Sequence, residues 1–391
     1  MHRTRLAAAA VTAAALLAPT VADAADEVRI GMVTTLSGPG SGLGIDIRDG
    51  FMLAITQRDG TLGGLPVEVV EGDDTREPDV ARTLVQRMIE RDRVDIITGI
   101  VWSNLALAVM PTIARNEVFF ISANAGPSAL AGEQCNPWFF NVAYQNDNNH
   151  EAMGQAMSDM GYATAVILAP NYPAGQDSLT GFQRYYNGEV LEEIYTQLGQ
   201  LDYAAEIARI RDAAPEAVFF FYPGGMGINF IQQYVQAGLA DTIPFFGPAF
   251  SFDQTILAAV GDAALGRSNT AQWSPDLDNP ANAEFVADFI AAYGRIPSLY
   301  AAQGYDAALL IDSAVAAVDG AVEDRDAFRT ALEAAEFDSV RGEFRFNTNH
   351  YPIQNFYLRE VVRNDDGELT NRIVGTVFED HGDAYAEACS M

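Results

Sequence analysis

The 391-residue chain contains no lysine, so arginine supplies all 23 of its basic side chains. Schiff-base catalysis through lysine and phosphate-binding loops that need a lysine are therefore excluded. Acidic residues number 53, which gives a formal net charge of −30. A field of this sign repels nucleic acids and anionic membranes, and at long range it repels anionic ligands too. We expect no nucleic-acid partner, and we attribute the acidity to solubility or to a saline habitat.

Cysteine and histidine are also scarce, with two and four residues respectively. In an oxidising compartment, two thiols such as Cys135 and Cys389 more often pair than stay free, and both states remain open from the sequence. His150, His350 and His381 lie far apart in the sequence, without the spacing of metal ligands. We expect neither a metal site nor a cofactor.

Long apolar runs are confined to the N-terminus, where Arg3 and Arg5 precede an alanine-rich run over 6–17. Small residues two apart follow and end at Ala24, so 1–24 is predicted to be a cleaved signal peptide. The run is too short to cross ~30 Å of hydrocarbon, and nothing later reaches the ~18 apolar residues of a membrane helix. No cysteine stands near the predicted cleavage site to carry a lipid anchor. We therefore predict a soluble, monomeric protein of the periplasm.

The remaining chain, about 365 residues, is longer than one hydrophobic core usually supports, so two lobes are expected. Short β-branched apolar runs alternate with segments of helical period, which is the pattern of a parallel sheet flanked by helices. The predicted fold class is thus α/β, with two doubly wound parallel-sheet lobes. Strands are expected over 28–34, 67–71, 95–101, 118–122, 163–169, 217–222 and 243–247. Helices are expected over 44–59, 79–91, 104–113, 226–237, 283–293 and 303–318.

Polar stretches interrupt this alternation and predict crossings between the lobes. They lie at 143–150, 270–280 and 346–351. The crossings assign 25–143 plus 273–347 to lobe 1 and 144–272 plus 348–391 to lobe 2. Strand-like runs over 342–346, 355–362 and 373–377, joined by Asn, Asp and Gly turns, predict a terminal β appendage.

Candidate binding residues follow from the strand ends, because open α/β sheets bind ligands beyond the carboxyl ends of their strands. Ser103 either caps the helix that follows it or donates to a ligand oxygen. The loop 124–126 either forms a plain turn or brings backbone amides close to an anion. Aromatic residues at these ends either stack on a ligand ring or simply pack. The candidates are Trp102, Ser103, Asn124, Ala125, Gly126, Tyr172, Gly224, Gly225, Phe250, Trp273 and Gln303.

Catalytic motifs are missing from the sequence. The glycines of 38–44 stand at every second position and do not match G-x-G-x-x-G. No G-x-S-x-G, G-x-x-x-x-G-K-[ST] or H-E-x-x-H occurs. No nucleophile and base can be paired, so we expect a binding protein and not an enzyme.

Several segments resemble the branched-chain amino-acid-type periplasmic binding proteins of ABC transporters, and the likeness runs from Val28 to about Val377. The resemblance implies a type I periplasmic-binding fold with three crossings, which closes on a ligand and presents it to a membrane permease. The segments are RIGMVTTLSGPGSGLG (29–44), GIVWSNLALAVMP (99–111), FISANAGPSALAG (120–132), PFFGPAF (244–250) and AAQGYDAALLIDSA (301–314).

The resemblance also implies roles for single residues. A ligand carboxylate would be held by Ser103 and the loop 124–126, and Tyr172 would close from the second lobe. The family's acid for a ligand ammonium stands in a G-P-E-G turn, which here reads GPAF with Ala249 in its place. Gly126 likewise replaces a hydroxyl residue of the amino-acid binders. Because an unpaired buried ammonium costs several kcal/mol, an α-amino acid would be held poorly.

A branch associated with aromatic acids resembles the chain more closely, through its NAGPS-LAG-x-x-C and NTAQW-P-D-L-DNP segments. The expected ligand is a benzoate-, cinnamate- or phenylacetate-type acid. The alternatives are a receptor for branched-chain amino acids, amides or urea, a periplasmic hydrolase, or a sensory domain that feeds a signalling receptor.

Overall fold

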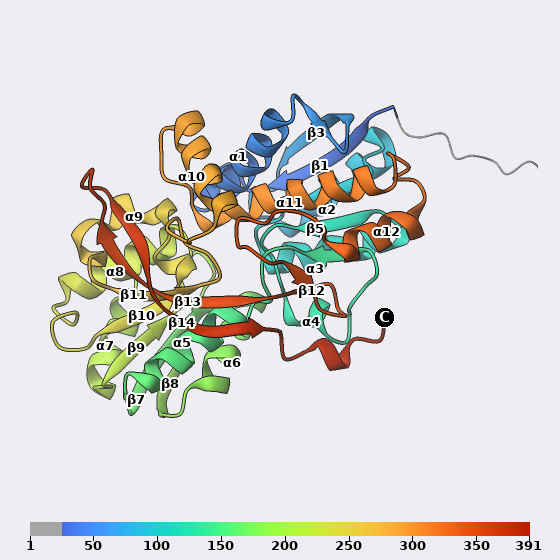
Figure 1. The fold of residues 1–391 in the computed structure, drawn as a ribbon. Helices are drawn as coiled ribbons and strands as arrows, with labels where there is room; N and C mark the ends of the chain where they lie inside the picture. Colours follow the sequence, from blue (N-terminus) through green and yellow to red (C-terminus); the bar gives the residue numbers. More distant parts are fainter. Residues whose placement is uncertain (1–25) are drawn as a thin grey trace, which may run out of the picture.

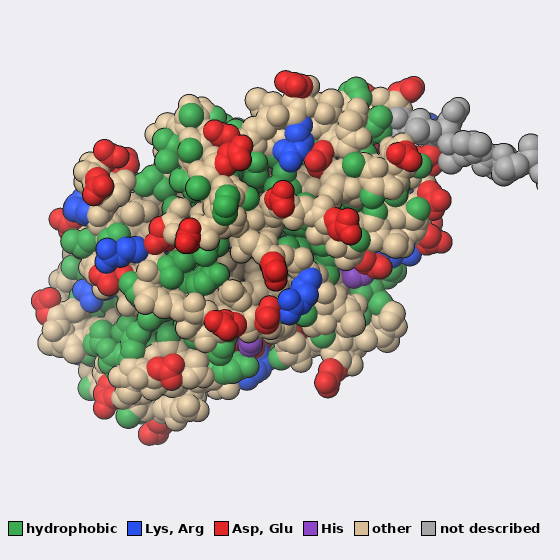
Figure 2. Space-filling view, viewed as in Figure 1, with side chains coloured by type: hydrophobic (Ala, Val, Ile, Leu, Met, Phe, Trp, Pro, Cys, Tyr) green, Lys and Arg blue, Asp and Glu red, His purple; other side chains and the backbone are tan. Residues whose placement is uncertain are grey.

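The computed structural model describes residues 26–391, which fold into two α/β lobes (Figure 1). The signal peptide predicted over 1–24 lies outside the described residues. Among the residues described, no helix combines the length and apolar character needed to cross a membrane. Acidic side chains are scattered over the visible face and outnumber the basic ones (Figure 2), as the net charge requires.

The first lobe is built on a six-stranded sheet with the order β2-β3-β1-β4-β5-β6. Its strands are β1 (Val28–Thr34), β2 (Thr61–Leu62), β3 (Leu65–Asp73), β4 (Ile96–Thr98), β5 (Phe119–Ser122) and β6 (Phe139–Asn141). All neighbours run parallel except β2, which is antiparallel to β3. Its helices are α1 (Ser41–Gln57), α2 (Pro78–Arg87), α3 (Ser103–Arg115), α4 (Ser128–Ala131), α10 (Pro280–Tyr293), α11 (Leu299–Ala317) and α12 (Arg325–Ala334).

The second lobe has an eight-stranded sheet with the order β12-β13-β11-β10-β9-β7-β8, and β14 pairs with β13. Its parallel strands are β7 (Thr164–Pro170), β8 (Glu189–Thr196), β9 (Ala217–Phe220), β10 (Phe245–Pro248) and β11 (Ser268–Ala271). Three antiparallel strands follow: β12 (Arg345–Phe346), β13 (Pro352–Arg363) and β14 (Leu369–His381). The helices are α5 (Asn148–Asp159), α6 (Pro173–Tyr185), α7 (Ala204–Ala213), α8 (Gly225–Gln236) and α9 (Gln254–Val260).

This architecture confirms the predicted α/β class with two parallel-sheet lobes. Strands β8 and β11 escaped prediction because one is a partly exposed edge strand with three glutamates and the other reads Ser-Asn-Thr-Ala. The predicted terminal appendage is instead part of the second sheet, since β13 pairs with β11 from Ser268 to Ala271.

The C-terminal segment departs from the predicted lobe division, which kept 348–391 together. After β14 the chain returns to the first lobe, where Cys389 forms a disulfide with Cys135 across a Cα–Cα distance of 5.5 Å. The pairing of the two cysteines, left open by the sequence, is thereby decided. Figure 1 shows the C-terminus close to α4. The two lobes are therefore joined by the last segment of the chain as well as by the crossings.

Helix α11 lies tightly against α1 because two glycines bring the backbones together. A Cβ on Gly50 would stand 2.0 Å from the carbonyl oxygen of Ala301, and one on Gly304 would stand 2.1 Å from that of Ile47. Neither position has room for any side chain. This packing fixes the first turn of α11, and with it Tyr300, at the cleft between the lobes.

Candidate functional site

A small cavity lies between the lobes, beyond the carboxyl ends of β4, β5, β7, β9 and β10. This is where ligands bind in open α/β folds. Both lobes and the first crossing contribute to its wall. The lining residues are Leu43, Val101, Trp102, Ser103, Asn124, Tyr144, Asn146, His150, Tyr172, Ala174, Phe221, Pro223, Phe250 and Tyr300.

On the first lobe, the cavity meets the N-terminus of α3 at Ser103. Trp102 precedes the helix without capping it through its side chain, and its Nε1 donates instead to Thr35 Oγ1 at 2.9 Å. The backbone N–H groups of Ser103 and Asn104 donate to no other group among the described residues. Free amides and the positive end of the helix dipole favour an anion at this point. Ser103 Oγ accepts from Asn146 Nδ2 at 3.1 Å, which leaves its own proton free to be donated.

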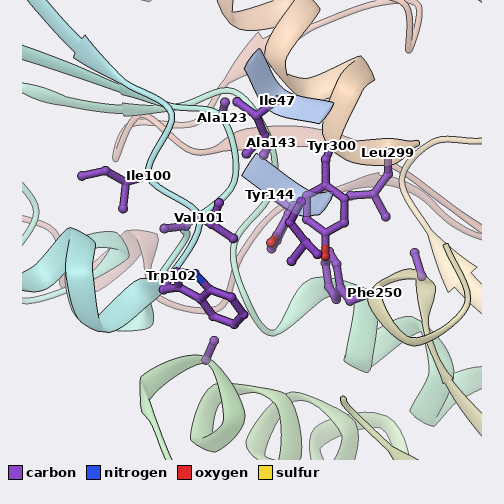
Figure 3. Close-up of a cluster of buried hydrophobic side chains, with 14 of the residues drawn as sticks. Ile47, Ile100, Val101, Trp102, Ala123, Ala143, Tyr144, Phe250, Leu299 and Tyr300 are labelled. Atoms are coloured by element: carbon purple, nitrogen blue, oxygen red, sulfur yellow. The ribbon is translucent and has the colours of Figure 1, made fainter. Parts of the chain in front are cut away.

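Asn124 and Tyr144 form a second fixed polar pair in the cavity wall. Asn124 donates from Nδ2 to the carbonyl oxygen of Val101 at 2.7 Å, and its Oδ1 accepts from the Tyr144 hydroxyl at 2.9 Å. The side chain of Asn124 is thus held rigidly between the loop after β4 and the first crossing. The close-up of buried hydrophobic side chains (Figure 3) shows Tyr144, Phe250 and Tyr300 close together, with Trp102 on another side of the group.

Aromatic rings form most of the remaining wall. Tyr172 of the second lobe reaches Trp102 of the first with ring centroids 6.3 Å apart, and it lies nearly parallel to Phe221 at 6.3 Å. Phe250, in the turn after β10, packs edge-on against Phe221 at 5.7 Å and contacts Tyr144 at 5.0 Å. Such rings present flat apolar faces on which a ligand ring can stack.

Three polar atoms in this wall are left without protein partners. His150 is paired through Nδ1 with Ser178 Oγ at 3.2 Å, but its Nε2 has no hydrogen bond within residues 26–391. The hydroxyls of Tyr172 and Tyr300 likewise have none there. Burial lowers the pKa of His150 to about 3 and raises the pKa of both tyrosines. All three groups are therefore neutral near pH 7.

The lining contains no acid and no arginine, so the cavity wall is uncharged once His150 is neutral. Ala249, which the resemblance puts in the place of an acid, is fully buried. The nearest carboxylate in the hydrogen-bond network is Asp177, which lies behind Asn146 and accepts from its Nδ2 at 2.8 Å. Among residues 26–391, no cluster of three His, Cys, Asp or Glu residues could hold a metal ion.

Five of the predicted site residues line this cavity together: Trp102, Ser103, Asn124, Tyr172 and Phe250. The other predicted residues lie elsewhere and are described in turn.

Ala125 and Gly126 shape the wall from behind. The carbonyl oxygen of Ala125 accepts from Ser122 and Asn141, and the Gly126 N–H donates to Asn146 Oδ1 at 3.2 Å. A Cβ on Gly126 would stand 2.2 Å from the carbonyl oxygen of Tyr144. Glycine is therefore required here by the close approach of the backbone, and the Gly126 amide already has a partner.

Gly224 and Gly225 face the other lobe at the mouth of the cleft, where the Gly225 N–H points to the Pro39 carbonyl oxygen at 3.4 Å. Trp273 is buried beside α10 and donates from Nε1 to Asn282 Oδ1 at 2.7 Å. Gln303 is buried in α11, and its amide has no hydrogen-bond partner among the described residues. None of these four residues lines the cavity.

Several lining residues were missed by sequence reasoning. Tyr144, Asn146 and His150 fall in the stretch predicted as a crossing. Phe221 falls near the end of a predicted strand, and Tyr300 falls three residues before the helix predicted over 303–318, although α11 begins at Leu299. One signal in the sequence could have pointed to the residues of the crossing. The stretch 143–150 is as polar as a surface loop, yet it contains the rings of Tyr144 and His150. Every residue in it is buried, as expected for a hinge that also forms part of a binding site.

Comparisons with known proteins identify relatives of the chain. A family model described as periplasmic binding protein matches residues 27–368. Leu/Ile/Val-binding protein homolog 6 of Brucella melitensis is 28% identical over 376 residues, covering 93% of this chain and 95% of the relative. A solute-binding protein of an ABC transporter from R. palustris, solved in complex with benzoate, is 32% identical with a TM-score of 0.88 and covers 93% of this chain and 100% of its own. Another from Rhodopseudomonas palustris BisB5, in complex with 3,4-dihydroxy benzoic acid, is 29% identical with a TM-score of 0.85, covering 92% and 99%.

Proposed function

The chain belongs to the periplasmic binding protein family, and we propose that it is the substrate-binding component of an ABC uptake transporter for an aromatic carboxylic acid. Membership confirms the resemblance that the sequence segments indicated, together with the type I periplasmic-binding fold. The proteins that the chain matches are solute-binding proteins and not enzymes. The role is therefore that of a receptor that binds and releases an unchanged ligand.

The observation that carries the proposal is the uncharged, ring-lined wall of the inter-lobe cavity. An α-amino acid would bury its ammonium group without a carboxylate partner, at a cost of several kcal/mol. A carboxylate instead meets Ser103 Oγ and the free N–H groups at the start of α3. The rings of Trp102, Tyr172 and Phe250 suit a flat apolar body. Benzoate and 3,4-dihydroxy benzoic acid, bound by two structural neighbours, have this shape.

Binding would proceed by closure of the lobes. The carboxylate docks on α3 in the first lobe, and rotation of the second lobe then brings Tyr172 and Phe250 over the ligand ring. The closed, loaded form is the one that a membrane permease would recognise. This role places the mature protein in the periplasm after removal of the predicted signal peptide.

A thermal-shift screen of the purified chain tests the proposal. Benzoate, cinnamate or phenylacetate should raise the melting temperature, because a ligand at 100 times its Kd stabilises the native state by about 2.7 kcal/mol. Leucine, valine and urea are the comparison ligands, and they should give no shift. Stabilisation by leucine or valine with none by the aromatic acids would overturn the ligand class. Recovery of the bound acid unchanged after long incubation would separate a receptor from a hydrolase.

A further inference from the structure

We propose that His150, positioned by Ser178, recognises a hydroxyl group on the ring of the bound acid, so that the preferred ligand is a hydroxylated aromatic acid. This inference rests on the proposed function and specifies its ligand class. The second-lobe side of the cavity then contains a polar subsite, and a different subsite holds the carboxylate.

The imidazole of His150 is fixed in place. The residue stands in the first turn of α5, and 1% of its surface is exposed. The edges of the rings pack against one another, with centroids 5.8 Å from Phe219 and 5.0 Å from Phe221. Ser178 Oγ lies 3.2 Å from Nδ1. The two ring contacts and the hydrogen bond at one nitrogen restrain the imidazole against the cavity that it lines.

The other nitrogen is the one that requires a partner. Nε2 has no hydrogen bond to any residue over 26–391, although the side chain is almost wholly buried. His150 lines the cavity, so a bound ligand can reach this nitrogen. A ligand that fills the cavity without a hydrogen bond to Nε2 would bury the atom unsatisfied, which is unfavourable. The apolar rings around His150 offer no such hydrogen bond.

A hydroxyl is the ligand group that matches a neutral imidazole. Burial lowers the pKa of His150 to about 3, so the ring has one N–H and one acceptor nitrogen near pH 7. If Nδ1 carries the proton, Nε2 accepts; if Ser178 donates to Nδ1, Nε2 donates. A hydroxyl can donate or accept and satisfies either tautomer, whereas a carboxylate could only accept and a ring C–H could do neither.

The subsite lies apart from the carboxylate end. Ser103 follows Trp102 directly, and Trp102 contacts Tyr172 at 6.3 Å. Tyr172 contacts Phe221 at 6.3 Å, and Phe221 in turn contacts His150 at 5.0 Å. Along this series of contacts, two rings separate the tryptophan beside the carboxylate site from the histidine. We therefore place the ligand hydroxyl across the ring from the carboxylate and not beside it.

Isothermal titration with benzoate and its 2-, 3- and 4-hydroxy derivatives tests the inference. The wild-type protein should bind 3- or 4-hydroxybenzoate at least tenfold more tightly than benzoate. The 2-hydroxy isomer should show no such gain, because its hydroxyl is adjacent to the carboxylate. His150→Phe keeps the aromatic packing but removes Nε2, and it should abolish the preference while still binding benzoate. His150→Gln, which restores a polar group, should recover part of the preference.

Two further variants separate recognition from structure. Ser103→Ala should weaken every acid by a similar factor and leave the hydroxybenzoate-to-benzoate ratio unchanged, because it acts at the carboxylate end. If His150→Phe fails to fold, Ser178→Ala serves in its place and should lower the ratio by freeing the imidazole. Equal wild-type affinities for benzoate and for both distal hydroxybenzoates would overturn the inference, as would an unchanged ratio in His150→Phe. Binding of leucine without any aromatic acid would overturn the proposed function itself.

Discussion

The Asp177 carboxylate of the second lobe accepts two hydrogen bonds from Ser128 of the first, at 3.0 Å from the backbone amide and 2.6 Å from the hydroxyl. The same carboxylate accepts from Asn146 Nδ2 at 2.8 Å. Asn146 in turn donates to Ser103 Oγ at the cavity. This contact between the lobes is therefore connected, through the side chain of Asn146 in the crossing, to Ser103 at the proposed carboxylate site.

Asp177→Asn should weaken ligand binding without changing the ligand profile. Ser128 and Asn146 both donate to the Asp177 carboxylate, and the amide nitrogen of an asparagine cannot accept their hydrogen bonds. The closed form therefore loses at least one charge-assisted hydrogen bond, worth about 1.5–3 kcal/mol. We expect Kd to rise by about tenfold or more by titration calorimetry. Thr180→Ala, at an exposed position of the same helix, is the control and should bind as the wild type does. Unaltered affinity in Asp177→Asn would show that this contact contributes nothing to closure.

Ser103→Ala should reduce affinity for every carboxylate ligand. The hydroxyl is free to donate to the anion because it already accepts from Asn146. Loss of a hydrogen bond to a charged group costs about 1.5–3 kcal/mol, which corresponds to roughly ten- to a hundredfold in Kd. Thr112→Ala, at the far end of α3, controls for effects on the helix. Full-strength binding by Ser103→Ala would remove this residue from the site.

Asp253→Asn should flatten the dependence of stability on pH. Asp253 caps α9 and accepts from the Leu299 amide of the other lobe at 3.1 Å, and burial raises its pKa to about 7 against the opposing charge of Arg359. The native state therefore keeps a proton that the unfolded chain, with an ordinary pKa near 3.9, has released. Stability from this group is full below about pH 4 and falls as pH rises towards 7, by at most about 1.4 kcal/mol per unit.

Thermal melts from pH 4 to 8 measure this effect. Asparagine retains an acceptor for the Leu299 amide, so Asp253→Asn should lose less stability than the wild type as pH rises through this window. Burial also raises the pKa of Asp147 to about 7, so the part of the pH dependence of stability that comes from Asp147 should remain in the variant. Asp241→Asn, at an exposed position, is the control. Parallel melting curves for Asp253→Asn and the wild type would contradict the prediction.

Reduction of the Cys135–Cys389 disulfide should destabilise the protein. The bridge closes a loop with a sequence separation of 254, and a native disulfide typically contributes about 2–4 kcal/mol. Dithiothreitol should lower the melting temperature of the wild type and leave the Cys135→Ser/Cys389→Ser double variant unchanged. A double variant that responds equally to the reductant would show that the loss comes from elsewhere.

The residues that were predicted and those that were missed differ in how local their signals are. Trp102, Ser103 and Tyr172 follow strands directly, so an apolar run and a helix start were enough to place them at the cleft. His150 and Tyr300 line the cavity because of tertiary packing, such as the contact of α11 with α1 at Gly50 and Gly304, which no local pattern encodes. Trp273 was also predicted to lie in the site, yet Asn282 holds it beside α10.

Because the chain returns to the first lobe after β14, its last residues tie the two lobes together. Strand β14 ends at His381 in the second lobe, and the disulfide pins Cys389 to the first. An extended chain covers at most about 3.5 Å per residue, so these two points can never part by more than about 28 Å. The Tyr385 hydroxyl donates to Asp147 at 2.9 Å, which further shortens the part of this segment that is free to extend. The intact disulfide therefore limits how far the lobes can separate at this end of the molecule, and its reduction removes that limit.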